Sequence, residues 1–251
     1  FLIVTVDLDI ALDPTATTVR SRLTLRPNPA HRGKPGALKL DGWNLKLGDI
    51  RLEGKTVPAS RYRLTATQLT LPAVPNRPFT LETTVTINPE ANTALQGLYR
   101  SRGNFCTQCE AEGFRRITFF LDRPDVLSVY TCRIEAATAL APILLGNGNP
   151  VAGGKLDRGR RHFAVWHDPH PKPCYLFALV GGDLAAIRRP FTTMTGRKVD
   201  LAIYVEHGKE ARAAWAMDAL QRAMIWDERR FGRAYDLDVF NIVAVSDFNM
   251  G

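Results

Sequence analysis

Strict alternation of apolar and polar positions opens the chain. From Leu2 to Leu12 an apolar residue stands at every second position, which is the period of a β-strand with one buried face. After a turn at Asp13-Pro14 the alternation returns from Val19 to Leu25, so the pattern predicts a hairpin. Its polar face should set opposite charges across the two strands, which favours a structural role there. The expected partners are Asp7 and Asp9 on the first strand and Arg20 and Arg22 on the second.

Short apolar segments follow at regular spacing. Before the middle of the chain they cover residues 37–40, 45–52, 62–71 and 79–87, and later they cover residues 129–136, 143–145, 161–166 and 175–180. Turn residues separate them, including a Pro/Gly/His loop at Pro27 to Pro35 and the Gly-Asn-Gly-Asn run at Gly146 to Asn149, which is typical of a hairpin turn. This spacing predicts an all-β sheet or sandwich.

The pattern changes after Gly181-Gly182-Asp183. Residues 191–205 still alternate, with a turn at Gly196, but residues 211–231 place Ala214, Met217, Leu220 and Met224 on one helical face. Gly232 is placed to end that helix. Residues 238–245 are almost continuously apolar, which favours a strand buried on both faces beneath helices. We therefore expect an all-β domain over residues 1–183 and an α/β segment over residues 184–251.

Composition narrows the class of protein. The chain has 251 residues, 45% of them hydrophobic and 23% charged, and no apolar run approaches the roughly 18 residues of a membrane span. Its net charge of +8 comes from scattered arginines without a basic, aromatic-rich patch, so neither a membrane nor a nucleic-acid partner is expected. Four cysteines in so long a chain favour a reducing compartment over a disulfide scaffold. Both ends fall beside strands, so we expect a piece of a longer protein.

Chemistry concentrates between Phe105 and Val126. This stretch, FCTQCEAEGFRRITFFLDRPDV, holds two cysteines, a glutamine and the carboxylates of Glu110 and Glu112 ahead of an apolar run. Gly113 should allow a sharp turn with positive φ, and the alternation over residues 117–121 predicts a strand after it. Taken alone, two glutamates in a loop are usually solvated surface groups.

The Cys106-x-x-Cys109 pair has three readings. A zinc site would need further ligands, for which the sequence offers His167, His170 and Cys174. A redox motif should follow a strand and precede a helix, and this one does not. The third reading, two reduced thiols packed beside the loop, is favoured. No His-Glu-x-x-His sequence occurs anywhere, so we expect no catalytic residue and no bound metal in this chain.

Several stretches carry a family resemblance. They are TQCEAEGFRRITFFLDRPDV, NPEANTALQGLYRS (Asn88 to Ser101), DPHPKPCYLFALVGGDL (Asp168 to Leu184) and the carboxy-terminal stretch from Trp215 to Gly251, which ends in DLDVFNIVAVSDFNMG. In this order they resemble bacterial-type aminopeptidase N, a family of zinc exopeptidases. The resemblance implies an amino-terminal all-β domain followed by the opening segment of a thermolysin-like catalytic domain.

The resemblance also implies site residues. Gln108 and Glu110 would hold the free α-amine of a peptide substrate, because a carboxylate at the end of a cleft pairs with an ammonium. Met250 would line the first specificity pocket, and Gly251 would be the first residue of a Gly-Ala-Met-Glu-Asn motif that guides the substrate chain. Glu112 is left as structural.

The resemblance also implies properties of the whole protein. The parent would be a cytoplasmic enzyme that needs zinc, acts on peptides through their free amino terminus, and completes its catalytic domain with residues outside this chain. The fragment alone should be inactive. The role of Asp122-Arg123-Pro124-Asp125 stays open. The alternative from another class is a non-catalytic β-sandwich interaction module, including a relative of the family that has lost zinc.

Overall fold

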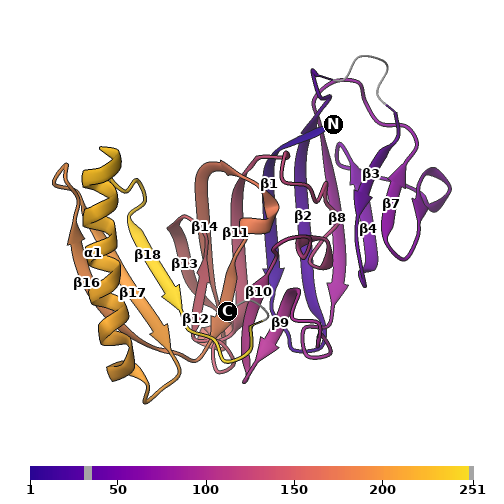
Figure 1. Cartoon of the computed structure of the whole chain (residues 1–251). Helices are drawn as coiled ribbons and strands as arrows, with labels where there is room; N and C mark the ends of the chain where they lie inside the picture. Colours follow the sequence, from indigo (N-terminus) through magenta and orange to yellow (C-terminus); the bar gives the residue numbers. More distant parts are fainter. Residues whose placement is uncertain (31–35, 249–251) are drawn as a thin grey trace.

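The computed structural model describes residues 1–30 and 36–248 of the chain. Within them the strands form one sheet of eight strands, one of four and two of three (Figure 1). The α-helix α1 (Ala214–Phe231) lies at one end of the molecule, beside the small sheet of β16, β17 and β18. The protein is therefore mainly β with an α/β carboxy-terminal part, which confirms the predicted fold class.

The large sheet runs in the order β13-β14-β11-β1-β2-β8-β4-β5. Its strands are β1 (Leu2–Ala11), β2 (Thr17–Arg26), β4 (Lys46–Leu52), β5 (Lys55–Thr56), β8 (Phe79–Ile87), β11 (Ser128–Ala137), β13 (Asn149–Leu156) and β14 (Arg161–Lys172). Neighbours are antiparallel except β1 and β11, which run parallel. One face of β2 and β8 is buried at every second residue, as the alternation predicted.

The predicted hairpin is confirmed in its register. Asp7 lies opposite Arg22 and Asp9 opposite Arg20 in the β1–β2 ladder. Arg20 Nη1 is 3.6 Å from Asp9 Oδ2, and Arg133 of β11 contacts the other oxygen of the same carboxylate at 2.9 Å. Because these groups remain partly exposed, each pair contributes at most about 1 kcal/mol. They stabilise the sheet and carry no chemistry of their own.

Two smaller sheets share the core of the large one. One contains β9 (Gly97–Ser101), β10 (Asn104–Gln108), β12 (Ile143–Gly146) and β15 (Leu179–Gly182), and the other contains β3 (Leu38–Asp41), β6 (Arg63–Leu64) and β7 (Gln68–Leu71). Short 3-10 helices connect the strands: η1 (Ala59–Arg61), η2 (Phe114–Arg116), η3 (Asp157–Gly159), η4 (Cys174–Leu176) and η5 (Glu210–Ala213). Apolar residues of all three sheets join one hydrophobic cluster, so the arrangement resembles a sandwich.

The carboxy-terminal part builds its own cluster. β16 (Ala185–Thr192) pairs antiparallel with β17 (Lys198–Val205), and β17 pairs parallel with β18 (Val239–Val243). Met217, Leu220 and Met224 of α1 pack with apolar residues of these strands. Gly232 ends the helix with φ of 65°, and its N–H bonds to Glu228 O at 2.9 Å, as the sequence predicted. The division at Asp183 falls between β15 and β16 and stays a prediction.

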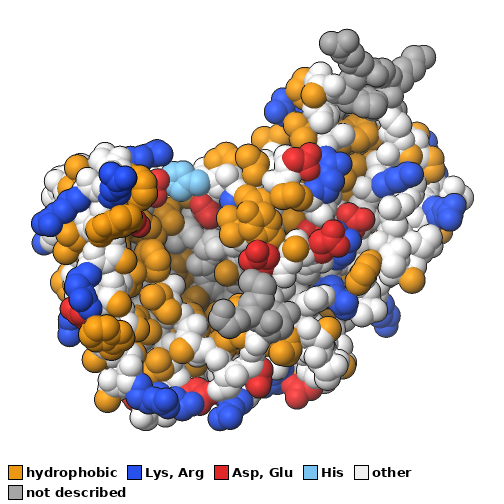
Figure 2. Space-filling model, in the orientation of Figure 1, with side chains coloured by type: hydrophobic (Ala, Val, Ile, Leu, Met, Phe, Trp, Pro, Cys, Tyr) orange, Lys and Arg blue, Asp and Glu red, His pale blue; other side chains and the backbone are white. Residues whose placement is uncertain are grey.

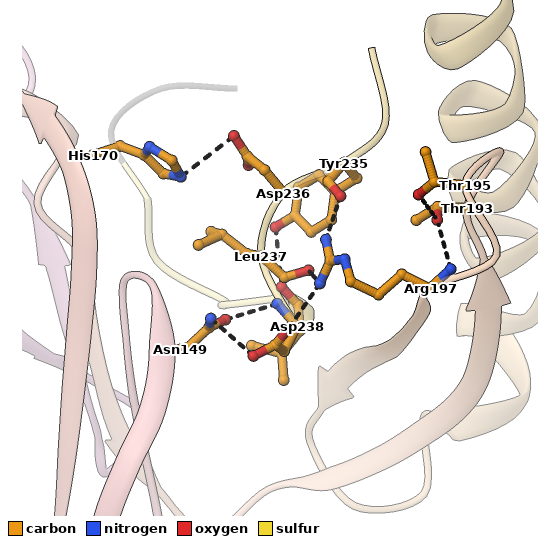
Figure 3. Close-up of polar contacts among 10 residues, drawn as sticks. Asn149, His170, Thr193, Thr195, Arg197, Tyr235, Asp236, Leu237 and Asp238 are labelled. Atoms are coloured by element: carbon orange, nitrogen blue, oxygen red, sulfur yellow. Dashed lines mark hydrogen bonds and ion pairs between the residues drawn. The ribbon is translucent and has the colours of Figure 1, made fainter.

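A hydrogen-bonded connection joins the two parts (Figure 3). Arg197 of the β16–β17 turn donates to the carbonyls of Tyr235 and Leu237 and to Asp238 Oδ1, the last at 2.7 Å. Asp238 then pairs with Asn149 of β13: Asp238 N–H donates to Asn149 Oδ1 at 2.8 Å, and Asn149 Nδ2 donates to Asp238 Oδ2 at 3.0 Å. The segment before β18 is thus bonded to both parts of the chain.

Two local predictions of secondary structure were wrong, each for its own reason. Residues 117–121 do not form a strand, because Ile117 to Phe120 are buried on every side and Phe120 makes a single bridge to Asp41. The run at Gly146 to Asn149 is no hairpin, because β12 pairs with β15 while β13 pairs with β14. Gly148, with φ of 83°, lets the chain cross between sheets where a Cβ would meet His167 O at 2.1 Å.

Strand limits differ elsewhere as well. Residues 175–180 begin within η4 and become a strand only at Leu179, and residues 62–71 divide into β6 and β7. β18 is half-buried instead of buried on both faces, since it is an edge strand of its sheet. The predicted loop at Pro27 to Pro35 lies partly outside the described residues. No helix among residues 1–30 and 36–248 is long and apolar enough to cross a membrane.

Candidate functional site

The β9–β10 hairpin presents one face to the candidate site. Its register sets Gln108 opposite Gly97, Cys106 opposite Tyr99 and Asn104 opposite Ser101. Side chains alternate along a strand, and cross-strand partners share a face. Gln108, Cys106 and Asn104 therefore lie on one side of the hairpin, together with Tyr99 and Ser101. Gln108 is the last residue of β10, so it stands where the strand enters the polar loop.

The loop after Gln108 turns tightly on itself. Gly113 N–H donates to Cys109 O at 2.8 Å, and the peptide bond between Glu110 and Ala111 is cis. The predicted positive φ at Gly113 is wrong, since its φ is −84°. The glycine is needed for space instead, because a Cβ there would lie 2.4 Å from Gln108 O. The loop thus packs against the end of β10.

Gln108 is buried, and its side-chain Nε2 is unpaired within the described part of the chain. Its residue exposure is 7%, and Nε2 has no acceptor among residues 1–30 and 36–248. A buried polar group left unpaired costs about 1 to 3 kcal/mol, so native proteins rarely keep one without a reason. The side chain of Gln108 is therefore a candidate ligand contact.

Glu110 and Glu112 differ in their surroundings. Glu110 is exposed and forms no ion pair or hydrogen bond with another residue of the described part of the chain. Glu112 lies 3.2 Å from Arg115 Nη1. The loop therefore contains one carboxylate with a protein partner and one without, two residues apart.

Asp122 is the buried acidic residue of the Asp122-Arg123-Pro124-Asp125 stretch. Its carboxylate is almost fully buried and accepts from the backbone N–H and Nε of Arg115, the latter at 2.8 Å. The thiol of Cys174 contacts the other oxygen at 3.0 Å. Arg123 pairs only with its exposed neighbour Asp125 among the described residues. Asp122 thus fixes the loop after the candidate site, while Arg123 stays at the surface.

The cysteines near the loop are buried thiols. All four cysteines are unpaired, and burial raises the pKa of Cys106 to about 12 and raises that of Cys109 as well. His167 instead contacts Thr131 Oγ1 at 3.0 Å, and His170 contacts Asp236 at 3.3 Å (Figure 3). In residues 1–30 and 36–248 no three His, Cys, Asp or Glu side chains converge to hold a metal.

The segment after β18 returns to the same hairpin. Tyr99 Oη donates to Asp247 O at 2.8 Å, and Ser101 Oγ donates to Asp247 Oδ2 at 2.8 Å. The last described residues therefore lie beside β9 and β10 (Figure 1). Met250 and Gly251, predicted from the sequence as substrate contacts, lie outside the described residues.

Tyr99, Ser101 and Asp247 are site neighbours that the sequence did not single out. Tyr99 and Ser101 lie 148 and 146 positions from Asp247, and none of the three belongs to a motif with known chemistry. Local signals could not have supplied Asp247.

Comparison with known proteins adds independent evidence on the family of the chain. The profile of the Peptidase M1 N-terminal domain matches residues 6–176. The whole chain is 54% identical to aminopeptidase N of Caulobacter vibrioides and 47% identical to that of Escherichia coli, and it spans 28% of the length of each. Among solved structures, aminopeptidase A of Legionella pneumophila in complex with aspartic acid superposes over all of this chain and 29% of its own, with a TM-score of 0.94 and 34% identity.

Proposed function

Because the chain belongs to the M1 peptidase family, we propose that it is the amino-terminal part of a zinc-dependent aminopeptidase that removes residues from the amino terminus of peptides. The chain itself contains no His-Glu-x-x-His sequence, and its described residues form no metal-binding cluster. We assign the zinc and the hydrolytic step to residues of the parent enzyme outside this chain, and we expect the chain alone to be inactive. Four unpaired cysteines suit the cytoplasm.

The role proposed for this part is recognition of the substrate α-amine. The observation that carries it is the pair of unpartnered groups at the end of β10: the buried amide of Gln108 and the exposed carboxylate of Glu110. A peptide terminus offers an ammonium for the carboxylate and a neighbouring carbonyl for the amide N–H. Glu112 is less suited to this role because it already pairs with Arg115 at 3.2 Å.

The charge of Glu110 should make the site specific for the free amino terminus of a peptide. An ammonium that loses water in a cleft needs a carboxylate within hydrogen-bond distance, and a charge-assisted bond is about twice as strong as a neutral one. A substrate whose amine is acetylated would leave that carboxylate desolvated and unpaired. Met250 and Gly251 are proposed to complete the pocket and to guide the substrate chain.

The full-length parent tests this directly by competition. Alanine amide and N-acetylalanine amide should be compared as inhibitors of the hydrolysis of an alanyl chromogenic amide. We expect the free amine to compete at least tenfold better, and Glu110→Gln to remove most of that difference while Glu112→Gln keeps it. Equal inhibition by both amides in the parent would contradict amine recognition. A parent without bound zinc and without turnover would indicate the non-catalytic module.

A further inference from the structure

A hollow of about 330 Å³ lies beside β9, where Leu98 forms part of its lining. Its lining includes Trp43, Asn88, Asn92, Leu98 and Arg116. Leu98 directly precedes Tyr99 in β9, so its side chain points away from the face that carries Tyr99. The lining contains neither Gln108 nor Glu110, so the inference does not rest on the proposed function.

Two adjacent arginines in η2 have opposite surroundings. Arg115 is bonded to Asp122 at 2.8 Å and to Glu112 at 3.2 Å. The guanidinium of Arg116 lies 5.1 Å from the ring centre of Trp43, over which Arg115 also lies at 5.8 Å, and the buried Nε of Arg116 has no acceptor among the described residues. Within residues 1–30 and 36–248, no carboxylate pairs with Arg116. A guanidinium remains charged at every physiological pH and offers five donors, so Arg116 keeps donors for an anionic ligand.

The walls of the hollow are fixed by hydrogen bonds that do not involve the cation. Asn92 Nδ2 donates to the carbonyls of Gln96 at 2.7 Å and Leu98 at 2.9 Å. The N–H of Trp43 donates to Arg115 O at 2.9 Å. The backbone of Trp43 and the side-chain amide of Asn92 are thus held in place before any ligand arrives, which lowers the entropy cost of binding.

Gly97 gives the stem of Arg116 its room. A Cβ at Gly97 would lie 2.7 Å from Arg116 Cβ, and the glycine has φ of 72°. Any other residue there would press on the arginine, whose side chain reaches into the hollow. The backbone is therefore shaped around this one side chain.

We propose that this hollow binds a small monocarboxylic acid with a flat apolar body. The fork of a guanidinium matches the two oxygens of a carboxylate, and the indole of Trp43 with Leu98 offers an apolar wall for the rest of the molecule. A phosphate dianion fits less well, because the described lining contains a single cation. The proposed anchor is Arg116, and the proposed wall is Trp43.

The test uses the full-length parent enzyme and 4-fluorobenzoate, followed by broadening of the ¹⁹F signal of the ligand. The enzyme is first stripped of metal, so that the carboxylate cannot bind there. The variants are Arg116→Gln, Arg116→Lys and Trp43→Leu, with Arg26→Gln as the control for an exposed arginine elsewhere. Thermal unfolding shows that each variant is folded.

We expect saturable broadening in the parent and in Arg26→Gln. Arg116→Gln should weaken binding at least tenfold, and Trp43→Leu should weaken it severalfold. Arg116→Lys should rescue only part of the loss, since an ammonium keeps the charge but lacks the fork. Absence of saturable binding in the parent would overturn the proposal and indicate that a carboxylate from the rest of the enzyme already occupies the arginine. Equal binding by Arg116→Gln would overturn it too.

Discussion

Ser101 and Asp247 bond to each other twice although they lie 146 positions apart: Ser101 Oγ donates to Asp247 Oδ2 at 2.8 Å and accepts from Asp247 N–H at 3.0 Å. The buried hydroxyl of Tyr99 adds a bond to Asp247 O. These contacts hold the segment after β18 against the hairpin that carries Gln108. The candidate site is thus assembled from two distant parts of the chain.

Ser101→Ala should loosen that assembly without unfolding the protein. The substitution removes two hydrogen bonds at a partly buried position, each with a net value of about 0.5 to 1.5 kcal/mol. In the full-length parent we expect kcat/KM for an alanyl amide to fall about threefold to thirtyfold, mostly through KM. Ser60→Ala, at an exposed position in η1, is the control and should change nothing. An unchanged KM in Ser101→Ala would mean that the contact does not position the site.

The buried pair of Arg115 and Asp122 should matter far more for stability. Both side chains are largely shielded from water, with exposures of 11% and 1%. Asp122→Ala would leave the guanidinium of Arg115 with only an exposed partner, and removing one member of a buried pair costs about 3 to 5 kcal/mol. Urea unfolding of the full-length parent measures the loss.

Asp125→Ala is the matched control for that experiment. Asp125 pairs with Arg123 in the same stretch, but both side chains are about half exposed. An exposed pair contributes about 1 kcal/mol or less. If the two substitutions proved equally destabilising, burial would not be what separates Asp122 from its neighbours.

The sequence predicted those elements whose burial is periodic and local. The alternation of β2, β8 and most of β1, the apolar face of α1 and its end at Gly232 all follow from short-range patterns. At the start of β1 a register shift between Ile3 and Thr5 buries Ile3 and exposes Val4, against the predicted alternation. Residues 117–121 defeated the same reasoning, because a segment buried on every side has no polar face to reveal its conformation.

The candidate site was predicted by other means. Gln108 and Glu110 were singled out through resemblance, since a glutamine and a glutamate in a loop carry no local signal of function. The contact of Ser101 with Asp247 was not predicted, because two common polar residues so far apart show nothing of their contact.

The cysteines should behave as protected, protonated thiols. Burial raises the pKa of Cys106 to about 12, so almost none of it is thiolate at neutral pH, and the thiolate is the reactive form. In the full-length parent we expect the four cysteines of this part to react with an aromatic disulfide reagent only after denaturation. Peptide mapping then shows which cysteines are labelled before denaturation and which only after it. Rapid labelling of Cys106 or Cys109 in the native protein would revive their redox or metal-binding reading.

The chain alone should self-associate through its carboxy-terminal part. Trp215, Trp226 and Phe231 of α1 are exposed at 73%, 59% and 66%, and Figure 2 shows hydrophobic side chains gathered over α1 and β18. Exposed apolar patches of this kind favour association. Sedimentation velocity should show concentration-dependent species for the chain, reduced by the double change Trp226→Lys and Phe231→Lys.

Hydrogen exchange on the same sample tests the order of that part. We expect weaker protection over β16, β17 and β18 than over β1, β2 and β8, because the smaller cluster contains far fewer buried side chains. Equal, strong protection in both parts together with a strictly monomeric chain would show that the carboxy-terminal part folds without the rest of the enzyme.

The central claim concerns the two glutamates of one loop. Glu110→Gln keeps the shape of the side chain and removes the charge proposed to meet the substrate ammonium, whereas Glu112→Gln removes a charge that already has a protein partner in Arg115. Losing one member of a desolvated charge pair costs about 2 to 5 kcal/mol. Gln108→Ala deletes a neutral hydrogen bond and should cost about 0.5 to 1.5 kcal/mol.

The measurement is kcat/KM of the full-length parent for an alanyl amide across Glu110→Gln, Glu112→Gln and Gln108→Ala, with folding checked by thermal unfolding. The predicted result is a loss of about 30-fold or more in Glu110→Gln, a smaller loss in Gln108→Ala and little change in Glu112→Gln. A larger loss in Glu112→Gln than in Glu110→Gln would contradict the assignment of the amine-binding carboxylate.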